Sequence, residues 1–223
     1  LPLPDGRRLC EAARLVLVPG LRLGLSAAAP ACATAPPLVV ASDAGRLDQV
    51  AGEVRDVVAR FPEAQVLEGD DATVARFLER APHAAWIHFA GHGLYRPELP
   101  HGSGLQLADG WLAASALSAT RFAADRVVLS ACQSARALVQ PGEEWFGLAR
   151  TLLLGGVRRV IAAQWDIDDR AARRFMAAWY AQVAGGASAA AALASVQADQ
   201  ARAGVHPIDW AGFVGLGGPE ALA

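Results

Sequence analysis

The sequence contains no lysine, so all 20 of its basic residues are arginine, and they are spread along the chain. With 22 acidic residues the formal net charge is −2. Proteins that bind nucleic acid through its phosphates carry a basic stripe or patch. Because the arginines form no such patch in the sequence, we expect no direct contact with nucleic acid.

Cysteine and long apolar runs are also scarce. Cys10, Cys32 and Cys132 are an odd number of cysteines without a Cys-x-x-Cys spacing, which indicates neither a disulfide framework nor a zinc site. We therefore expect no metal, no cofactor and a reducing, cytoplasmic location. No uninterrupted run is apolar enough to span a bilayer, so we expect no membrane partner. A flavodoxin-like or nucleotide-binding domain is disfavoured because the phosphate-binding glycine motifs are missing.

What the chain does contain is a large apolar fraction. Its 223 residues are 53% hydrophobic, enough to bury a substantial core. The opening Leu1-Pro-Leu-Pro-Asp-Gly6 has the composition of a linker, which suggests a piece of a longer polypeptide. We expect residues 1–37 to be a linker with a trimmed amino-terminal portion, and residues 38–223 to be the folded domain.

Strand and helix patterns alternate along the chain. Short apolar runs predict strands at 15–18, 38–41, 66–67, 84–90, 126–131 and 160–163. Helical spacing and caps predict helices at 48–61, 74–78, 113–117, 143–154, 169–184 and 187–203, with a polar loop before Gly142. Asp109-Gly110 predicts a hairpin turn within 105–112. The alternation favours an α/β fold with a mostly parallel sheet and helices on both faces.

Two of these predicted strands end in a reactive side chain. His92 follows the strand at 84–90, and Cys132 follows the strand at 126–131. The carboxyl ends of parallel strands open onto the crevice where such sheets place ligands. Gly91 and Gly93 flank His92 and allow close approach of a substrate. We therefore expect the thiol and the imidazole side by side at one edge of the sheet.

Each of these residues also has a purely structural interpretation. A lone cysteine at a strand end is often a small buried hydrophobe, so the catalytic hypothesis for Cys132 depends on its pairing with His92. His88 lies inside the strand, and we expect it to be a hydrogen-bonded core histidine rather than a second base.

Five segments of the chain resemble the motifs of the CHAT family, in the family's order: 88–93, 129–134, 147–157, 164–169 and 206–213. CHAT domains are caspase-like domains, related to separases, caspases and gingipains, that commonly follow tetratricopeptide repeats. The resemblance implies a caspase-like, three-layer α/β/α sandwich with a small β-hairpin insertion. The stretch from 19 to 37 is shorter and richer in alanine than in typical members.

The resemblance implies a cysteine endopeptidase that works through a Cys/His dyad and a thioester acyl-enzyme. Cys132 would attack the peptide carbonyl and His92 would protonate the departing nitrogen. The backbone N–H groups of Gly93 and Cys132 would form the oxyanion hole. The alternative is a catalytically silent binding or scaffold module.

In this clan the first side-chain pocket lies beside the loop that begins at Trp165, so Trp165 and Asp166 are the candidate substrate-binding residues. An acidic residue there would select arginine or lysine. However, Asp166, Asp168 and Asp169 also precede a predicted helix, where aspartate caps free N–H groups.

The resemblance also implies partners: a protein or peptide substrate, and an upstream repeat or sensor module that regulates activity. Clients of the family include proteins of bacterial defence or signalling systems, such as gasdermin-like pore formers.

Overall fold

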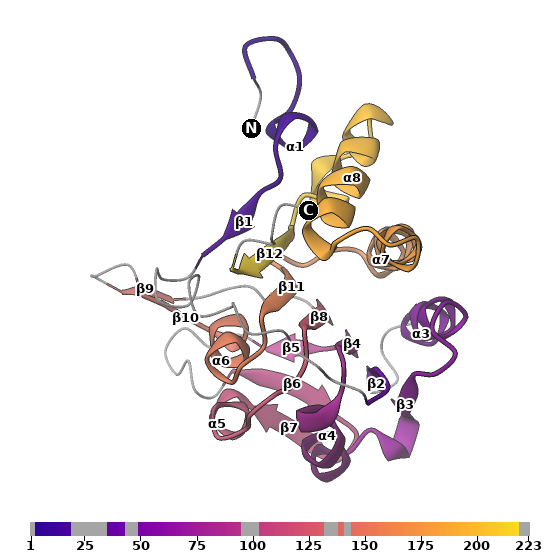
Figure 1. Ribbon diagram of the computed structural model, residues 1–223, viewed down its shortest axis with the longest axis vertical. Coiled ribbons are helices and arrows are strands. Elements are labelled where there is room, and N and C mark those ends of the chain that lie inside the picture. Colours follow the sequence, from indigo (N-terminus) through magenta and orange to yellow (C-terminus); the bar gives the residue numbers. More distant parts are fainter. Residues whose placement is uncertain are drawn as a thin grey trace.

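The computed structural model describes residues 3–18, 35–42, 49–94, 103–131, 138–140 and 144–218. Its central sheet has seven strands: β1 (Val16–Leu17), β2 (Leu38–Ser42), β3 (Gln65–Glu68), β4 (Ile87–Gly91), β8 (Arg126–Ala131), β11 (Arg159–Ala163) and β12 (Phe213–Gly217). Their order is β1-β12-β11-β8-β4-β2-β3, as Figure 1 shows. All neighbours are parallel except β11 and β12, which are antiparallel. The predicted, mostly parallel sheet is confirmed.

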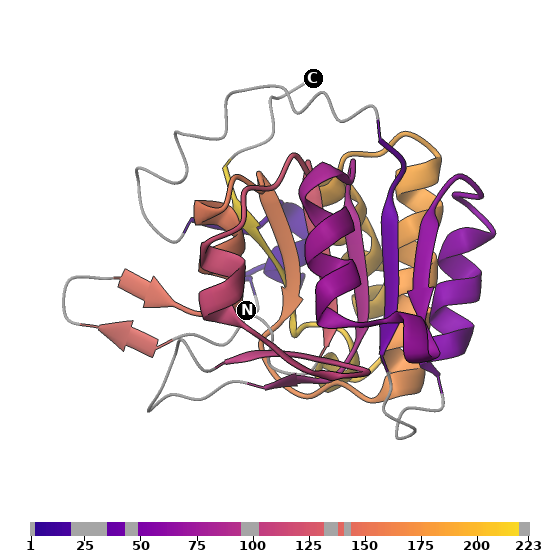
Figure 2. The same cartoon turned by 90° about the horizontal axis from the view of Figure 1, so that it is seen from below.

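Helices cover both faces of this sheet (Figures 1 and 2). They are α1 (Leu9–Ala12), α3 (Val50–Val58), α4 (Val74–Arg80), α5 (Ala114–Ser118), α6 (Leu148–Leu154), α7 (Asp169–Ala184) and α8 (Ala189–Arg202). The apolar side chains of α3, α7 and α8 pack on one face and those of α4, α5 and α6 on the other. The fold is therefore the expected three-layer α/β/α sandwich.

Successive side chains along the central strands point alternately into two buried cores, one on each face of the sheet. On β4, Ile87 and Phe89 pack into the core beneath α4, α5 and α6, whereas Ala90 packs into the core beneath α3 and α7. Because both faces of a strand are covered, its sequence is apolar throughout instead of alternating. This arrangement explains the continuous apolar runs at β4 and β8.

A second sheet follows β4 directly. Its three antiparallel strands are β5 (Gly93–Leu94), β6 (Gly104–Leu107) and β7 (Gly110–Ala113). The hairpin predicted around Asp109-Gly110 is confirmed as β6 and β7. The carboxylate of Asp109 also accepts a 2.8 Å hydrogen bond from the N–H of Val74, so the hairpin turn is tied to the first turn of α4.

The segment before α6 differs from the sequence prediction of a helix over 143–154. Residues Leu138–Gln140 form β9 and Glu144–Phe146 form β10, an antiparallel pair that projects from the central sheet (Figure 2). The helix begins only at Leu148, after Gly147 in an extended conformation. Aromatic residues favour strands, and the backbone of Trp145 and Phe146 pairs with β9 instead of starting a helix.

Other elements follow the prediction more closely. The predicted helix at 169–184 is confirmed as α7 with the same bounds, since Asp168 caps its start and Gly185 follows its end. The strand β12 was not predicted, because Gly215 and Gly217 weaken its strand pattern. Among the helices in the described ranges, none has both the length and the apolar character that crossing a bilayer requires.

Candidate active site

The strands that carry the two sequence motifs are direct neighbours. In the parallel pairing of β4 with β8, Ala90 is opposite Ser130 and Gly91 is opposite Ala131. His92 is the next residue after Gly91, and Cys132 is the next residue after Ala131. Cys132 itself lies outside the described residues. The two strands that precede the motif residues therefore end at paired positions.

His92 is half-buried between β4 and β5. Its backbone carbonyl accepts a 2.9 Å hydrogen bond from the N–H of Gln106 on the hairpin. Its Nε2 atom is buried and has no hydrogen-bond partner among the described residues. The hairpin therefore holds the backbone of His92 while one ring nitrogen is left for another interaction.

Two glycines shape the backbone around His92. At Gly91 a Cβ atom would collide with the carbonyl oxygen of Ser42 on β2, so the close approach of these strands requires glycine. Gly93 is the first residue of β5 and pairs with Leu105.

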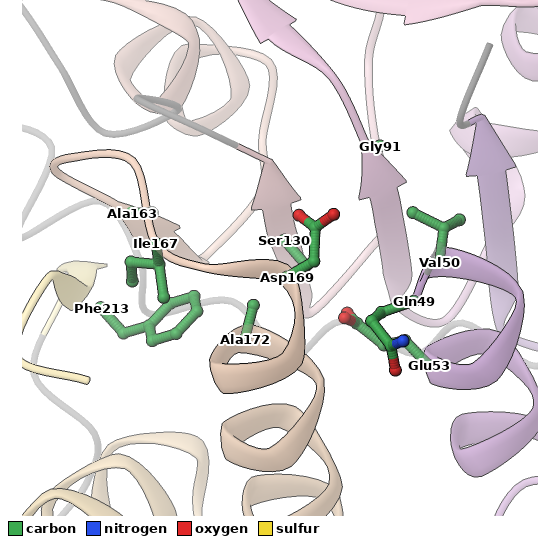
Figure 3. A pocket seen from close by; sticks show the side chains of 10 residues that line it. All are labelled: Gln49, Val50, Glu53, Gly91, Ser130, Ala163, Ile167, Asp169, Ala172 and Phe213. Atoms are coloured by element: carbon green, nitrogen blue, oxygen red, sulfur yellow. The ribbon is translucent and has the colours of Figure 1, made fainter. Parts of the chain in front are cut away.

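A cavity lies beside the carboxyl ends of the central strands (Figure 3). It contains about 430 Å³ of space, part of it open to solvent. Its floor is formed by strand ends and its walls by α3 and α7. The described lining residues are Gln49, Val50, Glu53, Gly91, Ser130, Ala163, Ile167, Asp169, Ala172 and Phe213. The cavity therefore reaches the residue before His92 and the residue two before Cys132.

Two carboxylates face this cavity from opposite walls. Glu53 comes from α3 and Asp169 from the first turn of α7 (Figure 3). Glu53 is buried, and its Oε1 atom lies 3.0 Å from Nε2 of His88. Sequence reasoning did not single out Glu53. A signal was present, because Glu53 lies three residues after Val50 and four before Val57, on the apolar side of the predicted helix.

A polar contact joins the two walls. Nε of Arg173 on α7 donates to Oδ2 of Asp56 at 2.8 Å, and its Nη1 atom donates to Oε1 of Gln49 at 3.1 Å. The hydrogen bond to Asp56 raises the pKa of Arg173. Its guanidinium packs against Gly52, where a side chain would collide with it. This contact fixes the start of α3 relative to α7.

The sequence-predicted substrate residues lie beside this cavity rather than among its lining residues. Nε1 of Trp165 donates a 2.9 Å hydrogen bond to the carbonyl of Ile208, and its ring packs against Gly212. Asp166 is exposed. Asp168 accepts hydrogen bonds from the N–H groups of Arg170 and Ala171, so the capping interpretation is confirmed for Asp168.

A second cavity, which contains about 1190 Å³ of space on the same measure and is partly open to solvent, lies between the amino-terminal segment and β12. Cys10 and Trp210 are among its lining residues, and the guanidinium of Arg8 stacks over the ring of Trp210 at 5.7 Å. Cys10 is a half-buried free thiol. Within the described ranges, no three His, Cys, Asp or Glu side chains are grouped so that they could hold a metal ion.

The chain belongs to the CHAT domain family, whose profile matches residues 1–218. The fold and the family together define a caspase-like, protease-related domain. Over 108 residues, 48% of this chain, it is 32% identical to mouse (Mus musculus) tetratricopeptide repeat protein 28, and this match spans 4% of that protein.

The fold is similar to that of two crystal structures of the Saccharomyces cerevisiae separase–securin complex. The TM-scores are 0.62 and 0.60, each at 18% sequence identity. The matches cover 82% and 84% of this chain and 12% of the other chain in each case. The chain thus spans a small part of the length of these relatives.

Proposed function

We propose that this domain is a cysteine endopeptidase in which Cys132 is the nucleophile and His92 is the general acid and base. The observation that carries the proposal is the pairing of Gly91 with Ala131. Neighbouring strands lie about 4.8 Å apart, so the residues that follow this pair leave the sheet within reach of one another.

The alternation of the strands supports a common face for the two reactive groups. Ala90 and Val128 both pack into the core beneath α3 and α7, and Ser130, opposite Ala90, lines the cavity on that face. Side chains two residues apart on a strand share a face. The cavity therefore lies beside the ends of both strands, at Gly91 directly before His92 and at Ser130 two residues before Cys132.

The proposed reaction follows from these groups. His92 takes the thiol proton, and the thiolate of Cys132 attacks the peptide carbonyl carbon to give a tetrahedral oxyanion. The carbon–nitrogen bond then breaks, the amine leaves with the proton from His92, and a thioester remains. Water, deprotonated by His92, attacks the thioester carbonyl, and the thiol is released.

The oxyanion needs two donors, and we assign the backbone N–H groups of Gly93 and Cys132 to this role. Gly93 has no side chain to block the approach of a carbonyl. Donors of this kind stabilise charge that develops only in the transition state.

The acidic side chains of the cavity support a preference for substrates that carry a basic residue before the cleaved bond. Glu53 and Asp169 face the cavity from opposite walls, and a guanidinium forms charge-assisted hydrogen bonds with carboxylates. The earlier candidate Asp166 stays a prediction, and Trp165 would form the outer wall. Asp166→Ala and Asp169→Ala variants distinguish the two acidic candidates by their relative cleavage after arginine.

Cleavage of a peptide library tests the proposal. Cys132→Ala should abolish cleavage, whereas Cys10→Ala, which removes a thiol beside the second cavity, should retain it. His92→Ala should reduce the rate by at least about a hundredfold, and the exposed His83 provides the matched control His83→Ala. Equal turnover by the parent and Cys132→Ala would leave a silent binding module as the function.

We further propose that an attached repeat or sensor module regulates this activity in a cytoplasmic defence or signalling system. The similarity to a tetratricopeptide repeat protein supports such a module. Full activity of the isolated domain on unstructured peptides would contradict this regulation.

A further inference from the structure

A buried pair of ionisable side chains lies beneath the acidic cavity, apart from the proposed dyad. Glu53 on α3 and His88 on β4 are 5% and 0% exposed, and their Oε1 and Nε2 atoms are 3.0 Å apart. The imidazole is not aligned for a hydrogen bond, since both atoms lack one among the described residues. The last torsion of a histidine side chain is soft, so a small rotation would align the ring.

His88 has no role in the proposed peptidase chemistry, so its burial needs another explanation. Its ring lies against Tyr180, in the apolar core that also contains Ala90, and burying an imidazole there is costly unless it has a polar partner. Glu53 is that partner.

Within the described ranges, His88 is the basic side chain that lies within ion-pairing distance of Glu53. From α7, the ring of Tyr180 lies 5.4 Å from that of His88, and its hydroxyl is buried without a hydrogen-bond partner among the described residues. Burial raises the pKa of Tyr180 well above its ordinary value, so the phenol stays neutral.

The other charged groups nearby are already engaged. From β8, Arg126 stacks over Trp86 at 5.0 Å, and on the outer side of α3 Arg173 is paired with Asp56. Asp169 faces the same cavity from α7.

We propose that His88 is a positioning residue that holds the Glu53 carboxylate at the cavity, where Glu53 selects a basic side chain. The inference rests on the proposed function, in which this cavity receives the side chain before the cleaved bond. Nε2 of His88 lies 3.0 Å from Oε1 of Glu53, so the imidazole fixes the place of the carboxylate beside β4. A carboxylate held there favours a guanidinium through charge-assisted hydrogen bonds.

The test uses the Cys132→Ala protein, which binds without cleaving, and two small probes of similar shape. Acetyl-arginine amide carries a guanidinium, and acetyl-citrulline amide is its neutral analogue. Binding is followed by NMR titration. We expect the arginine probe to bind more tightly than the citrulline probe.

Three substitutions in that background separate the roles. Glu53→Gln removes the charge and His88→Phe removes its partner, so each should weaken binding of the arginine probe about tenfold while citrulline binding is unchanged. His88→Gln keeps an N–H donor. It should retain the arginine preference, a rescue by the conservative variant that a merely structural role for His88 does not produce.

The outcomes are separable. An undiminished arginine preference in Glu53→Gln or His88→Phe, or no preference in the parent, would overturn the proposal. If His88→Phe does not fold, the arginine preferences of Glu53→Gln and His88→Gln decide. If the otherwise unmodified domain cleaves no peptide but shows the Glu53-dependent preference, the peptidase proposal fails and the assignment of the pair stands.

Discussion

At the scale of single residues, several buried polar atoms lie near the proposed site. The Nε2 atom of His92, both ring nitrogens of His88 and the hydroxyl of Tyr180 are buried without hydrogen-bond partners among the described residues. Most buried polar groups in proteins are paired. These four atoms lie on β4, on the residue that follows it and on α7, in the region that we assign to catalysis and selectivity.

Tyr180→Phe isolates the energetic cost of one such atom. At neutral pH the substitution should leave stability unchanged or raise it by up to about 1 kcal/mol, because the hydroxyl has no partner to lose. Above pH 10 the unfolded chain ionises its tyrosine, whereas burial raises the pKa of Tyr180 well above 10.0 and keeps the folded form neutral. The parent should therefore lose up to about 1.4 kcal/mol of stability per pH unit there.

Urea unfolding at about pH 7 and about pH 11 measures both effects. The Phe variant should lose less stability than the parent on the alkaline side, and an equal loss would show that other groups control it.

At the scale of elements, the sequence predicted most strands and helices, and the failures have local causes. α7 was predictable because a cap at Asp168 and a glycine at Gly185 bracket an apolar helical pattern. β12 was not, since its strand character comes from pairing with β11 and β1 rather than from its own residues. The same contrast between local pattern and tertiary contact holds for the site. His92 and Cys132 stand out in the sequence, whereas Glu53 becomes significant only through its contact with His88.

The close approach of β2 and β4 gives a prediction about Gly91. Gly91→Ala should cost roughly 2 kcal/mol more stability than Gly110→Ala, because a Cβ at Gly91 meets the carbonyl of Ser42. Gly110 is the matched control: its φ of 149° is similar to the 159° of Gly91, but it has open space around it. Denaturant unfolding measures the difference, and Gly91→Ala should also lose the proposed peptidase activity through displacement of His92. Equal costs for the two variants would contradict the steric argument.

At the scale of the whole molecule, the amino-terminal segment is part of the described fold. β1 pairs in parallel with β12 at the edge of the sheet, and Leu9 and Leu17 line the second cavity. The sequence suggested a linker and a trimmed amino-terminal portion over residues 1–37, with a strand at 15–18, and β1 lies within that predicted strand.

Removal of residues 1–18 tests the contribution of this segment. We expect a melting temperature lower by roughly 5 °C, equivalent to about 2 kcal/mol, together with self-association through the uncovered edge of β12. Removal of residues 1–7 alone keeps α1 and β1 and should have little effect. Thermal unfolding and light scattering report both quantities, and an unchanged melting temperature after the longer deletion would support the linker interpretation.

The reversed direction of β12 brings Phe213, close to the end of the described chain, to the same rim as the ends of β4 and β8. Gln49 closes the opposite side of the cavity from near the start of the domain. A ribosome must therefore release nearly the entire domain before this cavity can close. Under the proposed function, a nascent chain would carry His92 and Cys132 and yet lack a complete cavity, which would protect the cell that makes it from premature cleavage.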